Sequence, residues 1–497
     1  MKPKETLIAL DVGTTSVKGL LCDTEGVVLD SFTASYPTYY PDALSVEQDA
    51  QEVFSAVVEV VKSLMARGGV EPSSVAGLVF AGILHSMVPV DSDGNALGRA
   101  LIWADKRAIG QSERLAGELD VEEVKGRTGC TLHPMYYLPR LIWFRERAHD
   151  IAMRTHKFVS IKEYILHRLF GRFVVDMSIA SGTGVWNMHT LDWDEDLLRM
   201  AGVDRGKLSD VVETTYLFRG LRPGCAAAIG LLEGTPCIVG GADGPLAHLG
   251  SVGLADDSMS MTIGTGAALR RKTARPAVPT GMEAWCYYMA EGTWLLGGVI
   301  QDAGIVLKWF CDTFVRSGDE LKDYELMNRY AAEVDPGAGG IVFFPFLGGE
   351  RCPHENPRVR GSLLGLSFNH SLKHMARGLM EGISYRLFSV YRMLAAGGDL
   401  DIVVTGGVLK SPVWLQIIAD FFGRSLWLPE AREGSAWGAI LIGLRALGVI
   451  PNLEGVSRFV GRRGKVTPNE ENHRAYEIIC RTYERAYGDV TNFFSGC

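Results

Sequence analysis

The segment that decides the fold reads ALDVGTTSVKGLLCD and covers residues 9–23. Apolar residues flank a Gly-Thr-Thr-Ser run, and this pattern predicts a β-hairpin whose turn begins at Gly13. Asp11 stands at the end of the first strand. Backbone N–H groups of such a turn can bind an anion, and a carboxylate beside them can hold a metal ion. Because many hairpins contain glycine and threonine, an ordinary hairpin and a phosphate-binding hairpin both stay open on this segment alone.

The bulk composition limits the classes of protein. The chain has 497 residues, of which 47% are hydrophobic and 22% are charged, and its net charge is −8. This length predicts two or three domains. The acidic balance argues against nucleic acid as a partner, because a nucleic-acid binder needs a basic face. It still allows an anionic ligand in a locally basic site.

Cysteine spacing and hydropathy predict the compartment. The nine cysteines are scattered and form no Cys-x-x-Cys pair. We therefore expect free thiols in a reducing cytoplasm rather than a disulfide framework or a zinc site. The first residues, MKPKETLIALD, lead directly into a strand without the apolar core of a signal peptide. The longest apolar stretches are too short or are broken by a charge, so we expect no membrane span.

Strand-like and helix-like segments alternate along the chain, which predicts an α/β architecture. Residues 51–69 have the apolar spacing of a helix that ends at two glycines, and residues 76–84 are typical of a buried strand. The best domain boundary lies near residues 250–257. We therefore expect an N-terminal domain over 1–252 and a C-terminal domain over 253–497.

The first hairpin has an echo in the second half. Residues 258–271, SMSMTIGTGAALRR, again predict a strand, a Gly-Thr-Gly turn and a strand. Residues 401–423 predict a buried strand, two glycines and a helix that starts at Ser411 and ends at Gly423. A strand, paired glycines and a helix N-terminus let a nucleotide lie close to the backbone, although an ordinary strand–helix unit has the same pattern.

Taken in order, these three signals resemble the phosphate-1, phosphate-2 and adenosine motifs of the actin, hexokinase and Hsp70 superfamily. The resemblance implies two ribonuclease-H-like domains with a nucleotide and sugar cleft between them. Residues 239–250, VGGADGPLAHLG, and residues 348–385 are similar to the FGGY carbohydrate kinases. Within that family, the stretches LHSMVPVDSDGNAL (84–97), IWADKRA (102–108) and RTGCTLHPMYYLPRLIW (127–143) most resemble gluconate kinases.

The resemblance implies a role for each matching residue. Asp243 matches the catalytic aspartate and also contacts the sugar, and Asp11 matches the aspartate that holds Mg²⁺. Substrate contacts are implied for His85, Asp105 and Arg107. ATP contacts are implied for Gly13, Thr14, Thr15, Lys18, Gly264, Thr265, Gly266, Gly304, Lys308, Gly406, Gly407 and Ser411.

Several of these residues have an equally ordinary structural explanation. His85 could be a core histidine bonded to backbone, Arg107 could pair with Asp105 or a neighbouring acid, and Lys308 could be a solvated lysine. Lys162 and Glu163 are expected to be a structural pair or surface charges.

The implied reaction is ATP-dependent phosphorylation of a primary hydroxyl on a small sugar acid or sugar. D-Gluconate, giving 6-phospho-D-gluconate, is the leading case, and xylulose, another pentulose or a polyol is the alternative. A sugar-binding regulator without catalysis and a filament-forming or chaperone ATPase are further alternatives. Departures from the family pattern, such as Gln301 and Asp302 where two asparagines are usual, put the sugar in doubt. Homodimers are frequent among similar kinases, so a homodimer is a further expectation.

Overall fold

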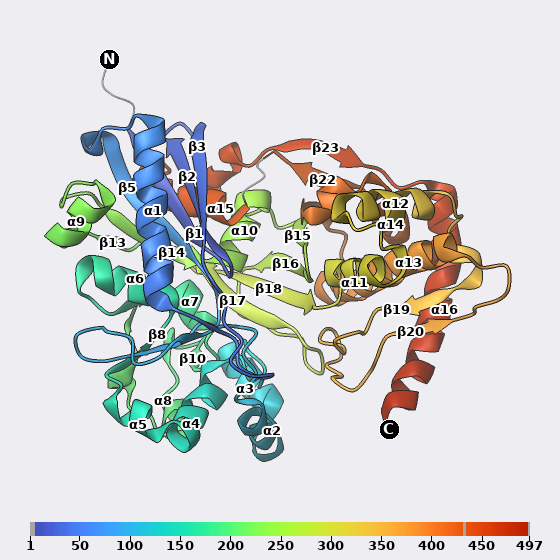
Figure 1. The fold of residues 1–497 in the computed structure, drawn as a ribbon, viewed down its shortest axis with the longest axis horizontal. Coiled ribbons are helices and arrows are strands. Elements are labelled where there is room, and N and C mark those ends of the chain that lie inside the picture. The colour runs from blue at the N-terminus through green and yellow to red at the C-terminus, as the bar shows by residue number, and fades with distance from the viewer. Residues whose placement is uncertain (1–4, 431–433, 496–497) are drawn as a thin grey trace.

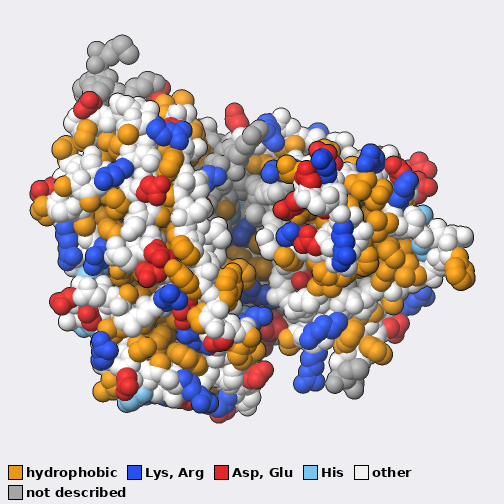
Figure 2. All heavy atoms as spheres, viewed as in Figure 1, with side chains coloured by type: hydrophobic (Ala, Val, Ile, Leu, Met, Phe, Trp, Pro, Cys, Tyr) orange, Lys and Arg blue, Asp and Glu red, His pale blue; other side chains and the backbone are white. Residues whose placement is uncertain are grey.

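The computed structural model describes residues 5–430 and 434–495. Two lobes, each built around one large sheet, lie side by side (Figure 1). A deep hollow separates them, and side chains of Lys and Arg gather along its floor (Figure 2). Cys497, one of the nine cysteines, lies outside the described residues.

The first lobe is built on a six-stranded sheet in the order β13-β14-β5-β1-β2-β3. Its strands are β1 (Thr6–Val12), β2 (Ser16–Asp23), β3 (Val28–Ser35), β5 (Val75–Gly82), β13 (Leu217–Phe218) and β14 (Cys237–Ala242). The predicted hairpin is confirmed, because β1 and β2 pair antiparallel, and β1 also pairs in parallel with β5. The predicted helix is α1 (Ala50–Gly68), capped by the Asp49 side chain and ended by Gly69 with φ 57°.

The second lobe is built on a seven-stranded sheet in the order β17-β18-β16-β15-β21-β22-β23. Its strands are β15 (Ser258–Ile263), β16 (Ala267–Thr273), β17 (Trp285–Ala290), β18 (Thr293–Ile300), β21 (Asp401–Gly406), β22 (Leu426–Pro429) and β23 (Arg462–Val466). Strand β15 pairs antiparallel with β16 and parallel with β21, as β1 does with β2 and β5. The echo read from the sequence is therefore a repeated arrangement of strands.

Two helices join the lobes. Helix α10 (Asp243–Val252) follows β14, and α15 (Gly434–Ala446) crosses it at very close range. A Cβ at Gly250 would meet the Gly434 carbonyl oxygen at 2.1 Å, so only glycine permits this crossing. Apolar residues of α15 pack against the first sheet, so a segment from the second half of the chain completes the core of the first lobe.

Further helices surround the sheets (Figure 1). Those of the first lobe are α2 (Ile109–Glu118), α3 (Val121–Thr128), α4 (Tyr137–Arg147), α5 (His149–Arg154), α6 (Ile161–Phe170), α7 (Met177–Ser181), α8 (Glu195–Ala201) and α9 (Pro223–Ile229). Those of the second lobe are α11 (Gly304–Phe310), α12 (Glu320–Ala332), α13 (Leu372–Ala395), α14 (Pro412–Phe422) and α16 (Glu470–Ser495). Ser411 caps α14 through the Trp414 N–H, and Gly423 ends it, as the sequence predicts.

The chain's remaining strands are short. They are β4 (Glu47–Gln48), β6 (Val88–Val90), β7 (Ala100–Leu101), β8 (Lys157–Val159), β9 (Val174–Asp176), β10 (Trp186–Asn187), β11 (Asp192–Trp193), β12 (Asp210–Val212), β19 (Val342–Phe344) and β20 (Ser362–Leu364). They form two-stranded pairs that hold loops beside the two large sheets.

Lys162 and Glu163 are structural, but they are neither on the surface nor paired with each other. Lys162 Nζ lies 2.6 Å from an Asp176 carboxylate oxygen, and both side chains are fully buried. Glu163 instead closes a capping box with Ser160 at the start of α6. Lys162 also donates a 3.0 Å hydrogen bond to the Gly241 carbonyl, two residues before Asp243.

The eight cysteines that the structure describes are all free thiols, as expected. Within residues 5–430 and 434–495, no helix is long and apolar enough to cross a membrane.

Candidate active site

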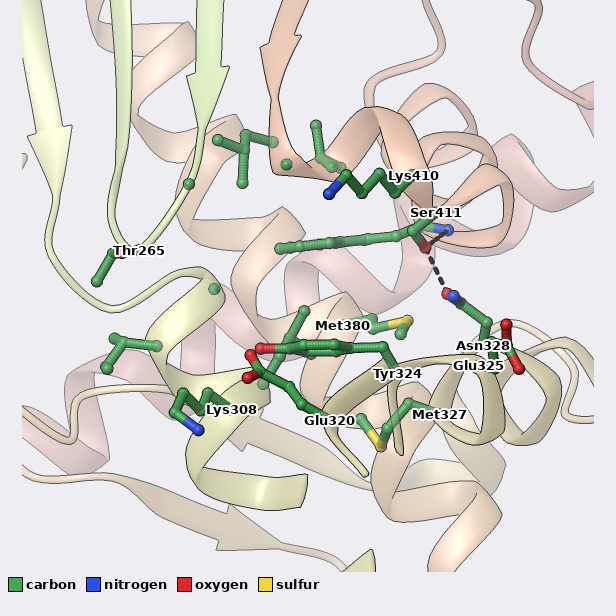
Figure 3. A pocket seen from close by; sticks show the side chains of 18 of the residues that line it. Thr265, Lys308, Glu320, Tyr324, Glu325, Met327, Asn328, Met380, Lys410 and Ser411 are labelled. Atoms are coloured by element: carbon green, nitrogen blue, oxygen red, sulfur yellow. Dashed lines mark hydrogen bonds between the residues drawn. The ribbon is translucent and has the colours of Figure 1, made fainter. Parts of the chain in front are cut away.

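A cavity of about 640 Å³ opens in the second lobe, between the β15–β16 turn, α11, α12 and the start of α14 (Figure 3). Six residues predicted to contact the nucleotide line it: Gly264, Thr265, Gly304, Lys308, Gly407 and Ser411. The side chains of Glu320, Tyr324 and Asn328 complete the wall, and all three come from α12. The sequence analysis missed these three, because their helix carries no glycine pattern that would mark it.

The glycines around this cavity fall into two groups, according to what a Cβ atom at each position would meet. A Cβ at Gly266, Gly304 or Gly406 would lie 2.8, 2.3 or 2.4 Å from a carbonyl oxygen, so backbone packing requires these three. A Cβ at Gly264 or Gly407 would meet nothing closer than 3.9 Å. Both of these line the cavity, so a bound molecule can approach their backbone closely.

Ser411 and Lys308 are already engaged. The Ser411 hydroxyl donates to the Asn328 side-chain oxygen at 2.5 Å, as the dashed line in Figure 3 marks. Lys308 forms an exposed 3.1 Å ion pair with Asp312, one helical turn away. The lysine therefore lines the cavity as a partly solvated side chain, and its phosphate contact stays a prediction.

The first hairpin is held by bonds to its own backbone. The Gly13 N–H donates to the Ser16 carbonyl at 3.0 Å, and the carbonyl of Thr15 accepts from the Tyr36 N–H at 3.2 Å. The Tyr36 hydroxyl also donates to the Gly13 carbonyl. Burial and the nearby Asp11 carboxylate raise the pKa of Tyr36, so this hydroxyl stays protonated and remains a donor.

Further contacts fix the edge of that turn. The Gln48 side chain donates to the Thr14 carbonyl, and Trp103 Nε1 lies 3.4 Å from the Thr14 hydroxyl. Lys18 lies across the hairpin from Asp11 in the strand register. None of Gly13, Thr14, Thr15 and Lys18 lines the cavity of Figure 3, so their contacts with a phosphate stay predictions.

Asp243 is the first residue of α10, at the carboxyl end of β14. Burial raises the pKa of its carboxyl group, while the Gly244 N–H and the guanidinium of Arg270 oppose this shift. The Gly244 N–H donates to a carboxylate oxygen at 2.7 Å. A desolvated carboxylate at a helix N-terminus is well suited to accept a proton from a substrate hydroxyl.

His85 makes the backbone contact that is expected of a core histidine. Its Nδ1 lies 2.8 Å from the Gly182 carbonyl, so Nδ1 carries the proton and Nε2 is left as an acceptor. The residue has φ 61°, an uncommon conformation for a side chain of this size. Burial, and then the charge of Arg351, lower the pKa of His85 to about 3, so the ring is neutral. A neutral acceptor of this kind can accept a hydrogen bond from a sugar hydroxyl.

Arg107 forms ion pairs with two acidic residues, as its ordinary structural explanation expects. Its Nε lies 2.9 and 3.0 Å from the two Asp105 carboxylate oxygens, and its Nη2 lies 2.6 Å from Glu47. Asp105 also accepts from the Val46 N–H at 2.8 Å. Arg107 and Asp105 therefore hold each other and a neighbouring strand in place, and direct contact with substrate stays a prediction for both.

Two of the departures from the family pattern build the loop after β19. The Gln301 side-chain amide donates to the Gly348 carbonyl at 2.6 Å, and the Asp302 carboxylate accepts from the Gly348 N–H at 3.0 Å. Burial raises the pKa of Asp302 to about 6. This loop carries Arg351, whose guanidinium Nη2 lies 3.5 Å from the Met135 sulfur in the first lobe.

The described residues hold no cluster of three or more potential metal ligands from His, Cys, Asp and Glu. Magnesium in kinases needs only one or two protein carboxylates, together with phosphates and water, so Mg²⁺ stays a prediction for this chain. Asp11 supplies a carboxylate at the end of β1, oriented by a 2.5 Å hydrogen bond from the Ser435 hydroxyl.

Comparison with known protein families identifies this fold. The model of the N-terminal domain of the FGGY family of carbohydrate kinases matches residues 6–250, and the C-terminal domain model matches residues 259–447. The chain belongs to the FGGY family of carbohydrate kinases. It is 34% identical over 506 residues to the gluconokinase of Bacillus subtilis. This alignment covers 99% of this chain and 98% of that relative. The xylulose kinase of the same organism is 28% identical, over 97% of this chain and 96% of that one.

Solved FGGY structures give the same result. The gluconate kinase from Lactobacillus acidophilus superimposes with a TM-score of 0.94, 27% identity and 99% coverage of both chains. The ligand-bound xylulose kinase from that organism has a TM-score of 0.94 and 26% identity, again over 99% of both chains. The two-domain fold with a cleft is therefore confirmed, and the chain is a kinase of sugar substrates that uses ATP. The filament-forming and chaperone ATPases are set aside.

Proposed function

We propose that this FGGY kinase transfers the γ-phosphoryl group of ATP to the 6-hydroxyl of D-gluconate, giving 6-phospho-D-gluconate and ADP. The observation that carries the proposal is the charge on the sugar side. The charge of Arg270 acts on Asp243, and that of Arg351 acts on His85, so a guanidinium group lies near each of two residues proposed to contact the sugar. A sugar acid supplies the negative charge that such a wall favours. The full-length similarity to gluconokinase supports the same substrate.

Asp243 acts as the base in this proposal. Its carboxylate accepts the proton of the 6-hydroxyl as that oxygen attacks the γ-phosphorus, and the bond from phosphorus to the oxygen of ADP breaks. The 6-phosphoester forms, and the proton leaves from Asp243 to solvent. Asp11 would hold Mg²⁺, which neutralises charge on the phosphates when it is bound.

The nucleotide would lie in the cavity of the second lobe. Gly264 and Gly407 would allow the nucleotide to lie close to the backbone, and Tyr324 would present its ring to the base or ribose (Figure 3). The hollow between the lobes then brings the phosphates toward the first hairpin. Closure of the lobes would exclude water from the transfer, which protects ATP from hydrolysis.

A pentulose such as xylulose is the second candidate. The xylulose kinase of Lactobacillus acidophilus is nearly as similar in sequence as the gluconate kinase and has the same TM-score. The charge of Arg270 and Arg351 is the observation against it, because a neutral sugar carries no negative charge for these guanidinium groups to attract.

The test is the identity of the product. The full chain is incubated with Mg-ATP and D-gluconate, and the product is examined by mass spectrometry and ³¹P NMR. We expect one added phosphoryl group whose phosphorus couples to the two protons of one CH₂ group. A phosphorus coupled to a single CH proton, or no product beside active turnover of xylulose, would overturn the proposal.

A further inference from the structure

Arg270 is a half-buried arginine whose side chain touches both lobes. It lies on β16, where it pairs with Gly297 of β18. Its Nη1 donates to the Thr262 hydroxyl at 3.2 Å. A Cβ at Gly244, the neighbour of Asp243 in the other lobe, would lie 3.5 Å from its Nε. The side chain therefore reaches from the second sheet to the first turn of α10.

In the part of the chain that the structure describes, Asp243 is the acidic group whose charge acts on the Arg270 guanidinium. The charge interactions of Arg270 are with Asp243 and Tyr287, and neither forms an ion pair or a hydrogen bond with it. Its Nε is buried without any hydrogen-bond partner among these residues. A buried N–H donor without a partner costs free energy, because its desolvation is not compensated. An anion that accepts a hydrogen bond from this Nε–H would remove that cost.

The surroundings of Arg270 indicate which reactant brings that anion. Arg270 does not line the nucleotide cavity of Figure 3. It acts instead on Tyr287, whose hydroxyl lies 3.0 Å from that of Tyr136 and whose ring centroid lies 6.0 Å from that of His85. Arg270 therefore borders the cluster of aromatic and histidine side chains on the sugar side of Asp243.

We propose that Arg270 binds the carboxylate of the sugar-acid substrate and so determines its specificity for an acid over a neutral sugar. The inference rests on the proposed function. The Nε–H and the second Nη of a guanidinium form a fork that matches a carboxylate through two parallel hydrogen bonds. The role differs from the one that the sequence predicted for Arg107, whose fork is occupied by Asp105.

The experiment compares two substrates that differ only in charge, D-gluconate and its neutral analogue D-gluconamide. We measure kcat/KM for both with the wild type, Arg270→Met and Arg270→Lys. Arg270→Met should lower kcat/KM for gluconate by about 10–100-fold, through KM, because it removes a charge-assisted pair of hydrogen bonds. The value for gluconamide should fall by a clearly smaller factor, because only the loss of the charge near Asp243 affects it. Arg270→Lys should recover part of the preference for the acid.

Arg271→Met is the matched control. Arg271 is the next residue of β16, so its side chain lies on the opposite face, where its Nη1 donates to the Leu394 carbonyl at 2.9 Å. This variant should keep the wild-type preference for gluconate. ADP binding, measured by calorimetry, shows that each variant is folded; if Arg270→Met does not bind ADP, Arg270→Lys decides by the same ratio of the two substrates.

The remaining outcomes distinguish an error in the role of Arg270 from an error in the proposed function. An equal fall of kcat for gluconate and gluconamide would mean that Arg270 acts on Asp243 or on the transferred phosphoryl group and not on the carboxylate, which overturns the inference. An unchanged preference in Arg270→Met or, where that variant is unfolded, in Arg270→Lys would overturn it as well, while the proposed function stands. Absence of gluconate phosphorylation by the wild type would overturn the proposed function itself.

Discussion

The hydroxyl of Ser435 donates a 2.5 Å hydrogen bond to the carboxylate of Asp11, although 424 residues separate the two. Ser435 lies in α15, the helix of the second half that packs on the first sheet. The bond therefore orients the carboxylate that we assign to Mg²⁺. We expect Ser435→Ala to raise the Mg²⁺ concentration needed for half-maximal rate severalfold, and Ser435→Thr to restore it. An unchanged Mg²⁺ dependence in Ser435→Ala would show that the bond does not position Asp11.

Removal of the base tests the assignment of Asp243. Asp243→Asn keeps the shape of the side chain but cannot accept the proton of the substrate hydroxyl. We expect the rate of phosphoryl transfer to fall by at least about 10²-fold, within the range that general bases supply, while ATP binding is retained. Asp210→Asn, at an exposed carboxylate, is the control and should leave the rate unchanged. Full turnover by Asp243→Asn would remove Asp243 from this role.

The rate should depend on pH through the same carboxyl group. Burial raises the pKa of Asp243, so its active, charged form is lost at a higher pH than for an ordinary aspartate. As the pH falls, kcat/KM should therefore decline above the usual aspartate pKa of about 3.9. Asp302, whose pKa is raised to about 6, is a second group that titrates nearby. The acid limb should persist in Asp302→Asn, and its disappearance there would assign the limb to Asp302 instead.

Substitution by alanine should affect different properties at two adjacent glycines, the stability of the fold at Gly406 and the KM for ATP at Gly407. Gly406 has φ 94°, and a Cβ there would lie 2.4 Å from the Ile263 carbonyl, so Gly406→Ala should destabilise the fold by roughly 1–3 kcal/mol. Gly407→Ala should leave the free energy of unfolding within about 0.5 kcal/mol but raise KM for ATP, because its methyl group enters the cavity. Thermal unfolding and ATP titrations separate the two effects. A stable Gly406→Ala or an unchanged KM in Gly407→Ala would contradict this division.

Arg107 should matter for stability more than for the choice of substrate. Its removal leaves the fully buried Asp105 carboxylate without its guanidinium partner. Arg107→Met should therefore lower the free energy of unfolding by about 3–5 kcal/mol, as for other broken buried pairs. Its kcat/KM values for gluconate and gluconamide should change by the same factor. A loss confined to gluconate would instead make Arg107 a ligand of the substrate carboxylate.

Much of the fold could be read from the sequence because it depends on local patterns. The Gly-Thr hairpins, the strand before Gly406 and the cap at Ser411 each follow from a few adjacent residues, and the structure has them at the predicted places. The sequence also showed glycines at the turns where backbone segments pack closely. The sequence alone could not separate those that backbone contacts require from those that border the cavity, because that difference depends on distant strands.

Contacts between distant segments explain what the sequence left open. Tyr324 and Asn328 line the nucleotide cavity from a helix whose amphipathic pattern looks ordinary. Arg270 is followed by another arginine in the sequence, and only the approach of α10 makes one of the two a half-buried group beside Asp243. The two partners of Arg107 were undecided for the same reason, since Glu47 reaches it only through the pairing of β4 with β7.

The most direct test of the central claim is the rate of ADP release with Mg-ATP across D-gluconate, xylulose, ribulose, glycerol and erythritol. The account predicts that kcat/KM for gluconate exceeds that for every neutral substrate by at least about tenfold. A higher kcat/KM for xylulose or another neutral sugar would contradict it, because the guanidinium groups near Asp243 and His85 would then not select an anionic substrate. Bound ATP with no ADP release from any of the five would favour the sugar-binding regulator.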